Sequence, residues 1–438
     1  MNYDLLKKTI ENEAARQGLT EYEIYYMANE ELSVDTLNKE QNSFSSGVSG
    51  GICFRALCDG KMGYAASELM EEGEMKALVS RAVENAKATE KPDTVGIFAG
   101  SPSYAELKNA DFTPKSAAEL KKLTMDLAEE IYNTGDKVAA GTATYGVTAG
   151  FTVRLSNSHG LNLETKCGIS ALQLQAVICD DGKYESAYDM KALASEVVEK
   201  AIKKAGAGFI ESGKYSIVLS AKQMRSLLSA FVSAFSAKTA QMGMSLLAGK
   251  EGEKIASDIV NITDDPMREG VSIQTNFDAE GVAAFRKSIV ENGTLKTLLH
   301  NRETAKKAGV ESTGNASKGG YASPVAVSPY AFCLEAGDKS EDELFAMVGD
   351  GIYITELSGL HAGANAVTGD FSIQSAGFKI VDGKLGEAVK SFTIAGNFFE
   401  LLKSIAALSD KVEVGVSGGF TTFGAPAVLI HNMSVAGK

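Results

Sequence analysis

The sequence predicts an α+β protein, in which an N-terminal region of helices and sheet precedes a strand-rich C-terminal domain with one long helix. Helix-like and strand-like segments are grouped rather than strictly alternating, which favours α+β over a doubly wound α/β fold. The C-terminal half also contains two clear hairpin-turn signals, Asn292-Gly293 and Asp382-Gly383, each between β-like runs. The 44 glycines suit a sheet with many tight turns.

Residues 1–90 are expected to form an N-terminal α+β domain. The helix Tyr3–Arg16 ends just before Gly18, a residue type typical of helix C-termini. Three β-like runs follow, and the turn signal Asp59-Gly60 separates the last two. These runs are Glu23–Met27, Val48–Leu57 and Met62–Ser67. A second helix is indicated by apolar residues at a 3.6-residue period from Met75 to Val83.

Residues 91–212 are expected to form a central segment packed with the first domain. The proline-containing stretch Lys91–Pro114 predicts a linker, and Ser116 with Glu119 predicts a capped helix start at the beginning of Ser116–Tyr132. Three or four strands are expected between Val138 and Tyr188, then a helix over Lys191–Lys204. Because the order helix, strands, helix repeats that of the first segment, an internal duplication is one interpretation.

Residues 213–438 are expected to form the C-terminal β-rich domain. It begins with a strand at Tyr215–Ser220 and the long helix Ala221–Ala248, after which strand patterns dominate. At 438 residues, the chain is too long for one compact core.

Composition excludes several classes of function. The net charge is −13 and no block of Lys or Arg occurs, which argues against direct nucleic-acid binding and against docking on an anionic membrane. No apolar run approaches the roughly 20 residues that span a bilayer, and the start lacks an apolar signal-peptide core, so a cytoplasmic location is expected. The five cysteines have no CxxC spacing and are expected to be reduced. A peptide or protein partner remains compatible with this composition.

Most catalytic patterns in the sequence have a simpler structural interpretation. The pair His300 and Glu303 is best explained as a polar turn that opens a helix, and Gly208–Tyr215 lacks the Ser or Thr that a phosphate loop needs. The pattern GxSxG occurs around Ser49 and Ser417, but β-like sequence follows both copies, where a nucleophile elbow requires a helix. The carboxylate pairs Asp180-Asp181 and Asp264-Asp265 are predicted to lie at turns or strand ends.

The segment Val367–Ser372 is a tentative substrate-binding site. A polar, glycine-containing stretch that leads into a strand can hold a peptide backbone, through Thr368, Gly369, Asp370 and Ser372. A bulged turn is the competing interpretation.

Several motifs, in order along nearly the whole chain, resemble the PmbA/TldD peptidase family, and specifically its PmbA branch, also called TldE. They are Gly50–Ala56, Phe277–Val282 with the Asn292-Gly293 hairpin, Ser312–Gly314, Thr368–Ser372, Ser375–Phe378, Thr393–Asn397 and Asn432–Gly437. The resemblance implies a cytoplasmic, zinc-dependent peptidase assembly that trims or matures peptides and that has been described as a modulator of DNA gyrase.

The resemblance also implies where a metal site would lie. The TldD branch carries an HExxxH helix and a cysteine near its C-terminus. The segment Ser245–Ser257 resembles the sequence that follows that helix, and counting back without gaps places Leu228 and Ser233 at the histidine positions and Ser229 at the glutamate position. Leucine and serine are unsuited to bind zinc or to act as a base, so no catalytic or metal-binding residue is expected on this chain.

The first hypothesis is therefore a non-catalytic subunit that pairs with a zinc-carrying TldD-type metallopeptidase. An autonomous metallopeptidase with a distributed metal site, using His300, Glu303 or His361, is the first alternative, so whether the chain is itself an enzyme stays open. A homo-oligomeric peptide-binding module is the second alternative. A homodimer of this chain is compatible with this module and also with the non-catalytic subunit.

Overall fold

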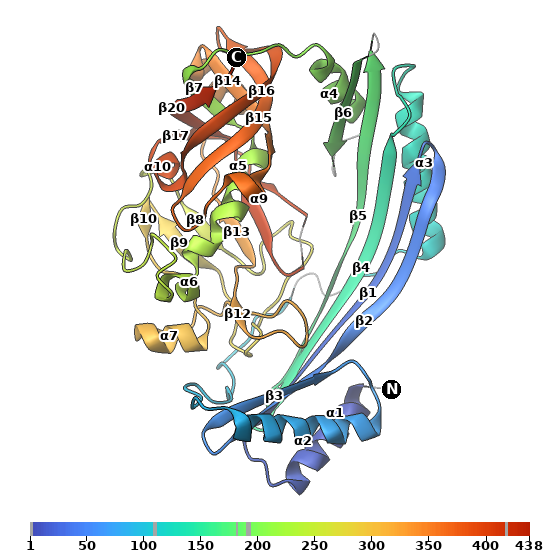
Figure 1. The fold of residues 1–438 in the computed structure, drawn as a ribbon, viewed down its shortest axis with the longest axis vertical. Coiled ribbons are helices and arrows are strands. Elements are labelled where there is room, and N and C mark those ends of the chain that lie inside the picture. The colour runs from blue at the N-terminus through green and yellow to red at the C-terminus, as the bar shows by residue number, and fades with distance from the viewer. Residues whose placement is uncertain (1–2, 108–111, 181–182, 190–193, 417–418) are drawn as a thin grey trace.

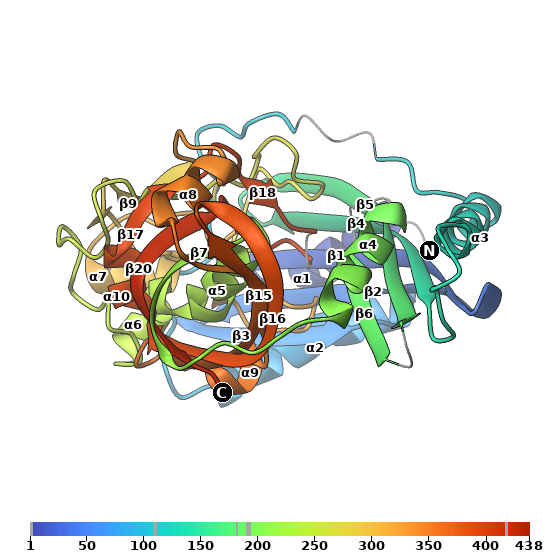
Figure 2. The same cartoon turned by 90° about the horizontal axis from the view of Figure 1, so that it is seen from above.

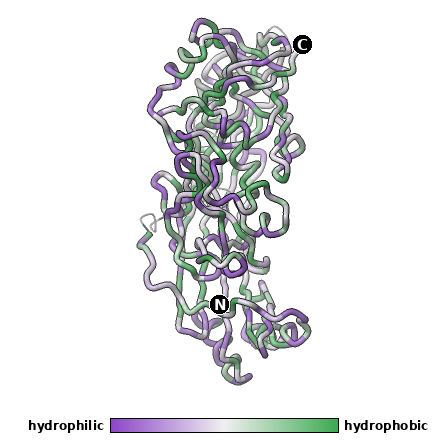
Figure 3. Tube along the Cα trace, turned by 90° about the vertical axis from the view of Figure 1, so that its left-hand side faces the viewer, coloured by the Kyte–Doolittle hydropathy of each residue, from purple (hydrophilic) through white to green (hydrophobic). Residues whose placement is uncertain are grey.

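The computed structural model describes residues 3–107, 112–180, 183–189, 194–416 and 419–438, and it confirms the α+β prediction. A long twisted sheet built by the N-terminal half runs beside a β-rich C-terminal body (Figure 1). Within the described residues, no helix is long and apolar enough to cross a membrane. Hydrophobic and hydrophilic residues alternate along the trace rather than forming one continuous apolar stretch (Figure 3).

The N-terminal sheet has six antiparallel strands in the order β3-β2-β1-β4-β5-β6. The strands are β1 Tyr22–Leu37, β2 Glu40–Cys58, β3 Lys61–Ser67, β4 Ala143–Asn157, β5 Asn162–Asp180 and β6 Lys183–Asp189. The helices of this half are α1 Tyr3–Arg16, α2 Glu72–Ala88, α3 Ala117–Asn133 and α4 Ala194–Ala205. The order helix, three strands, helix thus occurs twice, and the two copies meet at β1 and β4. The domain limits at residues 90 and 212 stay a prediction.

In this half, the predicted helix start at Ser116 and the predicted turn at Asp59-Gly60 are confirmed. Ser116 caps α3 and exchanges the predicted capping-box bonds with Glu119. Asp59 and Gly60 both have positive φ, as the tight hairpin between β2 and β3 requires. The strands are longer than predicted, because β1 and β2 continue as a ladder through polar residues that hydrophobic alternation does not detect. Ser49 lies within β2, so the first GxSxG is a strand segment, while Asp181 and Ser417 lie outside the described residues.

Each face of the sheet has its own core. On one face, Ile24, Ile52 and Phe54 pack against α1 and α2. On the other face, Tyr25 and Leu155 belong to a cluster with Phe277, Ala279 and Ala316 of the C-terminal region. The sheet is therefore the platform on which the C-terminal body rests.

The C-terminal body contains a closed barrel and a second sheet. The barrel strands are β7 Gly213–Leu219, β14 Gly351–Ser358, β15 Asp370–Val381, β16 Lys384–Asn397 and β20 Val428–Ala436. Pairing of β16 with β20 closes the ring that Figure 2 shows from above, and β17 (Ile405–Leu408) pairs with β20. The second sheet has the order β10-β9-β8-β13-β19-β18. Its strands are β8 Ile262–Asp264, β9 Lys287–Glu291, β10 Thr294–Leu295, β13 Ala331–Leu334, β18 Glu413–Val414 and β19 Thr422–Ala425.

Short elements complete this body. The helices are α7 Arg302–Ala308, α8 Glu341–Val348, α9 Leu360–Gly363 and α10 Phe398–Lys403, and β11 Ala316–Ser317 pairs with β12 Ala326–Val327. Both predicted hairpin turns are confirmed, since Asn292-Gly293 joins β9 to β10 and Asp382-Gly383 joins β15 to β16, with positive φ at all four residues. A Cβ on Gly293 would lie 2.3 Å from the carbonyl oxygen of Ala256, so glycine is required there.

The predicted long helix over Ala221–Ala248 is wrong. The structure has α5 Ala221–Phe231, a 3-10 turn over Val232–Phe235 and the short α6 Ala237–Gln241. The break follows from packing, because Phe231 stacks on Phe398 with ring centroids 4.5 Å apart, while Phe235 contacts Phe332. At Ser236 the backbone is extended and pairs with Leu299, which a continuous helix could not do. The apolar residues in this segment therefore do not form one face of a single helix, because Phe231 and Phe235 pack against different parts of the core.

Asp264, expected at a strand exit, does end β8, but its carboxylate is fully buried in a network that the sequence does not indicate. Lys287 Nζ lies 3.2 Å from Asp264 Oδ2, and Asn315 Nδ2 donates to the same oxygen at 2.7 Å. The backbone N–H of Tyr330 donates to Oδ1 at 2.8 Å. This network ties β8, β9 and the loop before β13 together, and it satisfies a charge that would otherwise be costly to bury.

A buried charged cluster lies where the sheet meets the C-terminal body. Glu23 on β1 and Arg55 on β2 are direct cross-strand partners, and the guanidinium approaches both carboxylate oxygens, at 2.8 and 2.9 Å. Burial acts to lower the pKa of Arg55, but the charge and hydrogen bonding of Glu23 outweigh it and raise the pKa. Lys318 Nζ lies 4.5 Å from the Tyr25 ring centroid, and burial lowers its pKa.

Arg302 and Glu280 extend this cluster to the linker. The backbone N–H of Arg302 donates to Glu280 Oε2 at 2.9 Å, while its guanidinium donates to the carbonyl oxygens of Gly96 and Val95. The predicted linker Lys91–Pro114 has no helix or strand in its described part, yet this contact fastens it to the start of α7.

Asp278 is the acid of this region with the most altered pKa. Its carboxylate is buried and accepts the N–H groups of Glu280, Val282 and Ala316 at 2.9–3.0 Å. Burial, together with the nearby Glu280 charge, raises the pKa of Asp278 to about 7.

We expect the stability of the protein to depend on pH through Asp278. Because the folded-state pKa is about 7 and the unfolded one about 3.9, the contribution is fully present below about pH 4 and is lost as the pH rises through 7. The loss is at most about 4 kcal/mol. Asp278→Asn should remove this dependence, as measured by urea unfolding at several pH values. Asp338→Asn, at an exposed side chain, is the control and should keep the wild-type profile. Parallel profiles for wild type and Asp278→Asn would contradict the assignment.

Candidate functional site

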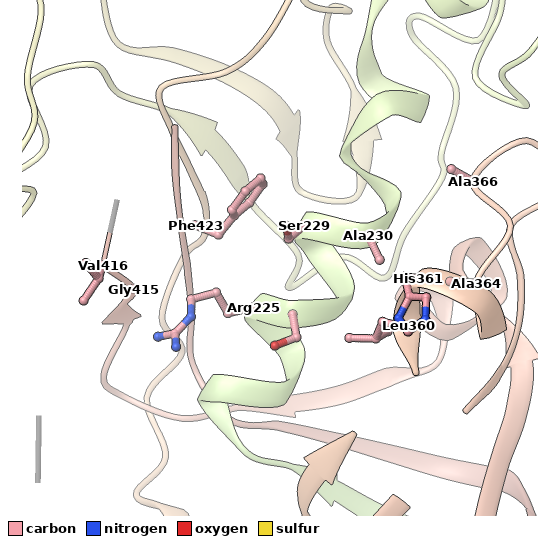
Figure 4. Close-up of a pocket in the computed structure, with 11 residues that line it drawn as sticks. Arg225, Ser229, Ala230, Leu360, His361, Ala364, Ala366, Gly415, Val416 and Phe423 are labelled. Carbon is pink, nitrogen blue, oxygen red and sulfur yellow. The ribbon is translucent and has the colours of Figure 1, made fainter. Parts of the chain in front are cut away.

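A cavity of about 500 Å³ lies beside α5. Three parts of the chain line it: α5, the segment from α9 to Ala366, and the β18–β19 hairpin region (Figure 4). The lining residues are Arg225, Ser226, Ser229, Ala230, Leu360, His361, Ala364, Ala366, Gly415, Val416 and Phe423. The walls are thus mostly small or apolar, with one guanidinium and one imidazole.

The amphipathic character of α5 explains its position. Met224, Leu227, Leu228 and Phe231 are buried in the core shared by the barrel and the second sheet. The opposite side of the helix presents Arg225 and Ser229 to the cavity, and in Figure 4 Arg225 lies on the side of Gly415, while Ser229 lies next to Phe423. A Cβ on Gly415 would lie 3.0 Å from Arg225 Nε, so the glycine leaves room for this side chain.

The three positions that the resemblance aligns with the HExxxH motif have different surroundings in the structure. Leu228 is fully buried and points away from the cavity, Ser229 is exposed and lines it, and Ser233 is exposed in the 3-10 turn without lining it. Of these three, Ser229 alone lies where it can touch a molecule in the cavity. Arg225 was not predicted as a site residue. Its position one helical turn before Ser229, on the polar side of the helix, could have indicated that it lies in the same site.

The residues around the cavity do not fit a catalytic zinc ion. Such a site needs about three protein ligands and a base, whereas this lining offers one imidazole, that of His361, and one cation, that of Arg225. His300 and Glu303 do not join it. His300 is buried and precedes α7, where Asn301 is the N-cap, and Glu303 pairs with Lys238 and Lys307. Among the described residues, no group of three or more His, Cys, Asp or Glu side chains is placed to hold a metal.

The interpretation of His300 and Glu303 as a polar turn opening a helix is confirmed, because α7 starts at Arg302. Burial lowers the pKa of His300. The phosphate-loop-like segment Gly208–Tyr215 leads into β7 rather than into a helix, as expected.

The tentative substrate-binding residues form a turn at the start of β15, next to the cavity wall. Thr368, Asp370 and Ser372 are exposed, and Gly369 is buried with φ +79°. The side chain of Asn365 accepts the N–H groups of Val367 and Thr368. None of the four residues lines the cavity, although Ala364 and Ala366 just before them do. Their role in substrate binding stays a prediction.

Asn397 holds this turn in place. Its Nδ2 donates to the carbonyl oxygen of Thr368 at 2.8 Å and to Asp370 Oδ1 at 3.0 Å, while its Oδ1 caps α10. The hydrogen bond from Asn397, and a second from Thr368, lower the pKa of Asp370. A Cβ on Gly369 would lie 2.9 Å from Asn397 Nδ2, so glycine permits this contact.

Comparison with protein families matches two parts of the chain. The model of the PmbA/TldA metallopeptidase C-terminal domain covers residues 212–437, and that of the PmbA/TldA metallopeptidase domain 1 covers residues 22–86. A protein named metalloprotease from Methanothermobacter thermautotrophicus is 30% identical over 420 residues, covering 90% of each chain.

Two solved structures are similar over nearly the full length. A protein of Thermotoga maritima described as a candidate modulator of a DNA gyrase has a TM-score of 0.89 and 28% identity, and the match covers 99% of this chain and 100% of that chain. TldE from Thermococcus kodakarensis has a TM-score of 0.83 at 23% identity, covering 98% of this chain and 99% of that one. The second likeness, at this identity, supports the fold alone.

We expect Asn397→Ala to destabilise the protein by about 2 kcal/mol, because it removes a helix cap and both bonds to the Thr368–Asp370 turn. Urea unfolding at pH 7 measures this. Asn133→Ala, at the exposed end of α3, is the matched control and should change the free energy of unfolding by less than about 0.5 kcal/mol. Equal effects of both substitutions would show that Asn397 does not hold the turn.

Proposed function

The chain belongs to the PmbA/TldD family of metallopeptidases, and on this premise we propose that it is a non-catalytic subunit of a TldD-type peptidase assembly. In this role the chain shapes the cleft through which a peptide reaches a zinc ion held by the partner subunit. The assembly would act in proteolysis or peptide maturation.

The observation that carries the proposal is the cavity on α5. The position that corresponds to the family's glutamate base is Ser229, and it lines the cavity, but a serine hydroxyl is a poor base near neutral pH. The positions that correspond to the two histidines hold Leu228 and Ser233, one buried and one turned away from the cavity. The cavity therefore has room for a bound molecule, but its lining lacks the groups that zinc hydrolysis needs.

The cavity lining suits contact with an extended chain. Leu360, Ala364 and Phe423 provide apolar walls for side chains, and Arg225 provides a charge that attracts carboxylates. We propose that a peptide segment, or a loop of the partner subunit that presents the peptide, occupies this space. The description of one relative as a gyrase modulator concerns that protein, and the net charge of −13 does not favour direct DNA contact by this chain.

The first test measures metal content and activity of the purified chain with and without a TldD-type subunit. We expect less than about 0.1 zinc per chain after zinc loading and dialysis, and no peptide cleavage by the chain alone. Cleavage should appear, or rise at least tenfold, when the partner is added. Stoichiometric zinc on the isolated chain that is lost in His300→Ala or His361→Ala would favour the autonomous metallopeptidase instead.

The second test fills the cavity. Ser229→Trp should abolish most of the stimulation of the partner's activity, because the indole occupies space that the peptide needs. Ser233→Trp, on the adjacent turn but outside the cavity, should leave the stimulation within twofold of wild type. Since both sites are exposed, circular dichroism and thermal melting should be nearly unchanged in both variants. Full stimulation by Ser229→Trp would show that the cavity plays no part.

A further inference from the structure

The charges that line the cavity on α5 differ from those of the chain as a whole. In the full sequence, 56 Asp and Glu residues outnumber 43 Lys and Arg residues. The described residues that line the cavity nevertheless include no Asp or Glu, but they include the guanidinium of Arg225 and the imidazole of His361. A cavity lined by one sign of charge raises the local concentration of ligands of the opposite sign. The lining therefore favours an anionic ligand.

The guanidinium of Arg225 lies along the wall that the β18–β19 hairpin region provides. In Figure 4 it points from α5 toward Gly415 and Val416. A Cβ on Gly415 would lie 3.0 Å from Nε and 3.3 Å from Cζ of Arg225, so the side chain lies directly against this glycine. A guanidinium has five N–H donors in one plane, and a carboxylate can accept two of them in parallel. Arg225 can thus keep its contacts within the protein and still bind a carboxylate.

Ser226 adds a hydrogen-bond acceptor to the same cavity. Its Oγ donates to the carbonyl oxygen of Lys222 at 2.9 Å, so its proton is used within the helix. The lone pairs of this oxygen suit an N–H donor and not a second carboxylate. A cation for a carboxylate and an acceptor for an N–H match the end of a peptide, because the last residue carries its N–H and its carboxylate on the same Cα.

The other walls suit a last residue that is small or apolar. Most of the other lining residues have such side chains themselves, namely Ala230, Leu360, Ala364, Ala366, Val416 and Phe423. No second guanidinium occurs among the described lining residues, so an acidic last side chain would lack a partner of its own. The volume of about 500 Å³ is typical of a pocket for a small molecule, and it has room for a few residues of a chain end.

We propose that the cavity on α5 binds the C-terminal end of a peptide, with the free carboxylate on Arg225 and a small or apolar last side chain against Phe423. The inference rests on the peptide-binding part of the proposed function, and it names the class of peptide that this site takes. An Asp or Glu side chain would offer the same chemical group from within a chain, so the test separates these two sources of a carboxylate.

Fluorescence anisotropy with three peptides tests the carboxylate. Each peptide carries a dye on its N-terminus and is titrated with the full-length chain at pH 7. The first peptide ends in alanine and leucine with a free carboxylate, the second is its C-terminal amide, and the third is that amide with one internal glutamate. We expect the free acid to bind at least about tenfold more tightly than either amide.

Substitution of Arg225 tests the assignment of the cation. In Arg225→Gln, the dissociation constant of the free acid should rise to within about twofold of that of the amide. Arg225→Lys keeps the charge without the planar fork, so it should retain only part of the preference. Lys222→Gln removes one charge from the same helix, at an exposed side chain outside the cavity, and should keep the wild-type preference. Circular dichroism checks that all three variants are folded.

Four outcomes would overturn the inference. They are equal dissociation constants of the free acid and the amide, binding of the glutamate-containing amide as tight as that of the free acid, an unchanged preference in Arg225→Gln, and no binding of the free acid up to about 1 mM.

Failure of the proposed subunit role would give a different result. If the chain prefers the free acid but never stimulates a TldD-type partner, that role is wrong while the carboxylate site stands. If the chain stimulates the partner equally on the acid and the amide, and binds both with equal dissociation constants, the role stands and the carboxylate site is wrong.

Discussion

The buried pairing of Glu23 with Arg55 is the contact on which the placement of the two halves depends. It lies on the face of the sheet that carries the C-terminal body, and Glu280, Lys318 and Arg302 gather around it from that body, with Asp278 next to Glu280. Within this cluster, the charge of Glu23 outweighs the cost of burying Arg55, whereas burial raises the pKa values of Asp278 and Glu280 and lowers those of Lys318 and Arg302. The sheet, the linker and the C-terminal loops must therefore come together in one arrangement, and the cavity on α5 is held in a defined position relative to the sheet.

In the candidate site, the residues that position α5 differ from those that line the cavity. The buried side of α5 is fixed by Phe231 and its neighbours, so the helix is positioned by the core and not by anything bound in the cavity. Substitution on its polar side can then change the chemistry without disturbing the fold. Folds support different functions in this way, and membership of a metallopeptidase family does not by itself fix what a given site can do.

The sequence predicts those parts of the fold that short-range physics determines. Asn292-Gly293 and Asp382-Gly383 demand tight hairpins, and Ser116 with Glu119 demands a helix start, whatever surrounds them. The break after Phe231 could not be predicted, because it depends on Phe398, which lies far away in the sequence. The role of Asp264 was hidden for the same reason, since Lys287 and Asn315 are distant partners.

The candidate site was predictable only in part, and again distance along the chain is the reason. Resemblance to a family located α5 and Ser229, but the cavity also needs His361 and Gly415, contributed by two other segments. No local pattern connects these three. The turn at Thr368–Asp370 was recognised as polar and glycine-containing, while its support by Asn397 was not.

The closure of the barrel by β20 has a consequence for biosynthesis. The ring joins β7 near residue 215 to a strand that ends at Ala436, and β16 has no second partner in the ring until β20 is in place. During vectorial synthesis on the ribosome, α5 and the first barrel strands emerge long before this strand does. The N-terminal sheet can thus form early, while the apolar interior of the barrel stays exposed until translation has passed residue 436. A nascent chain of this protein is an expected client of ribosome-associated chaperones.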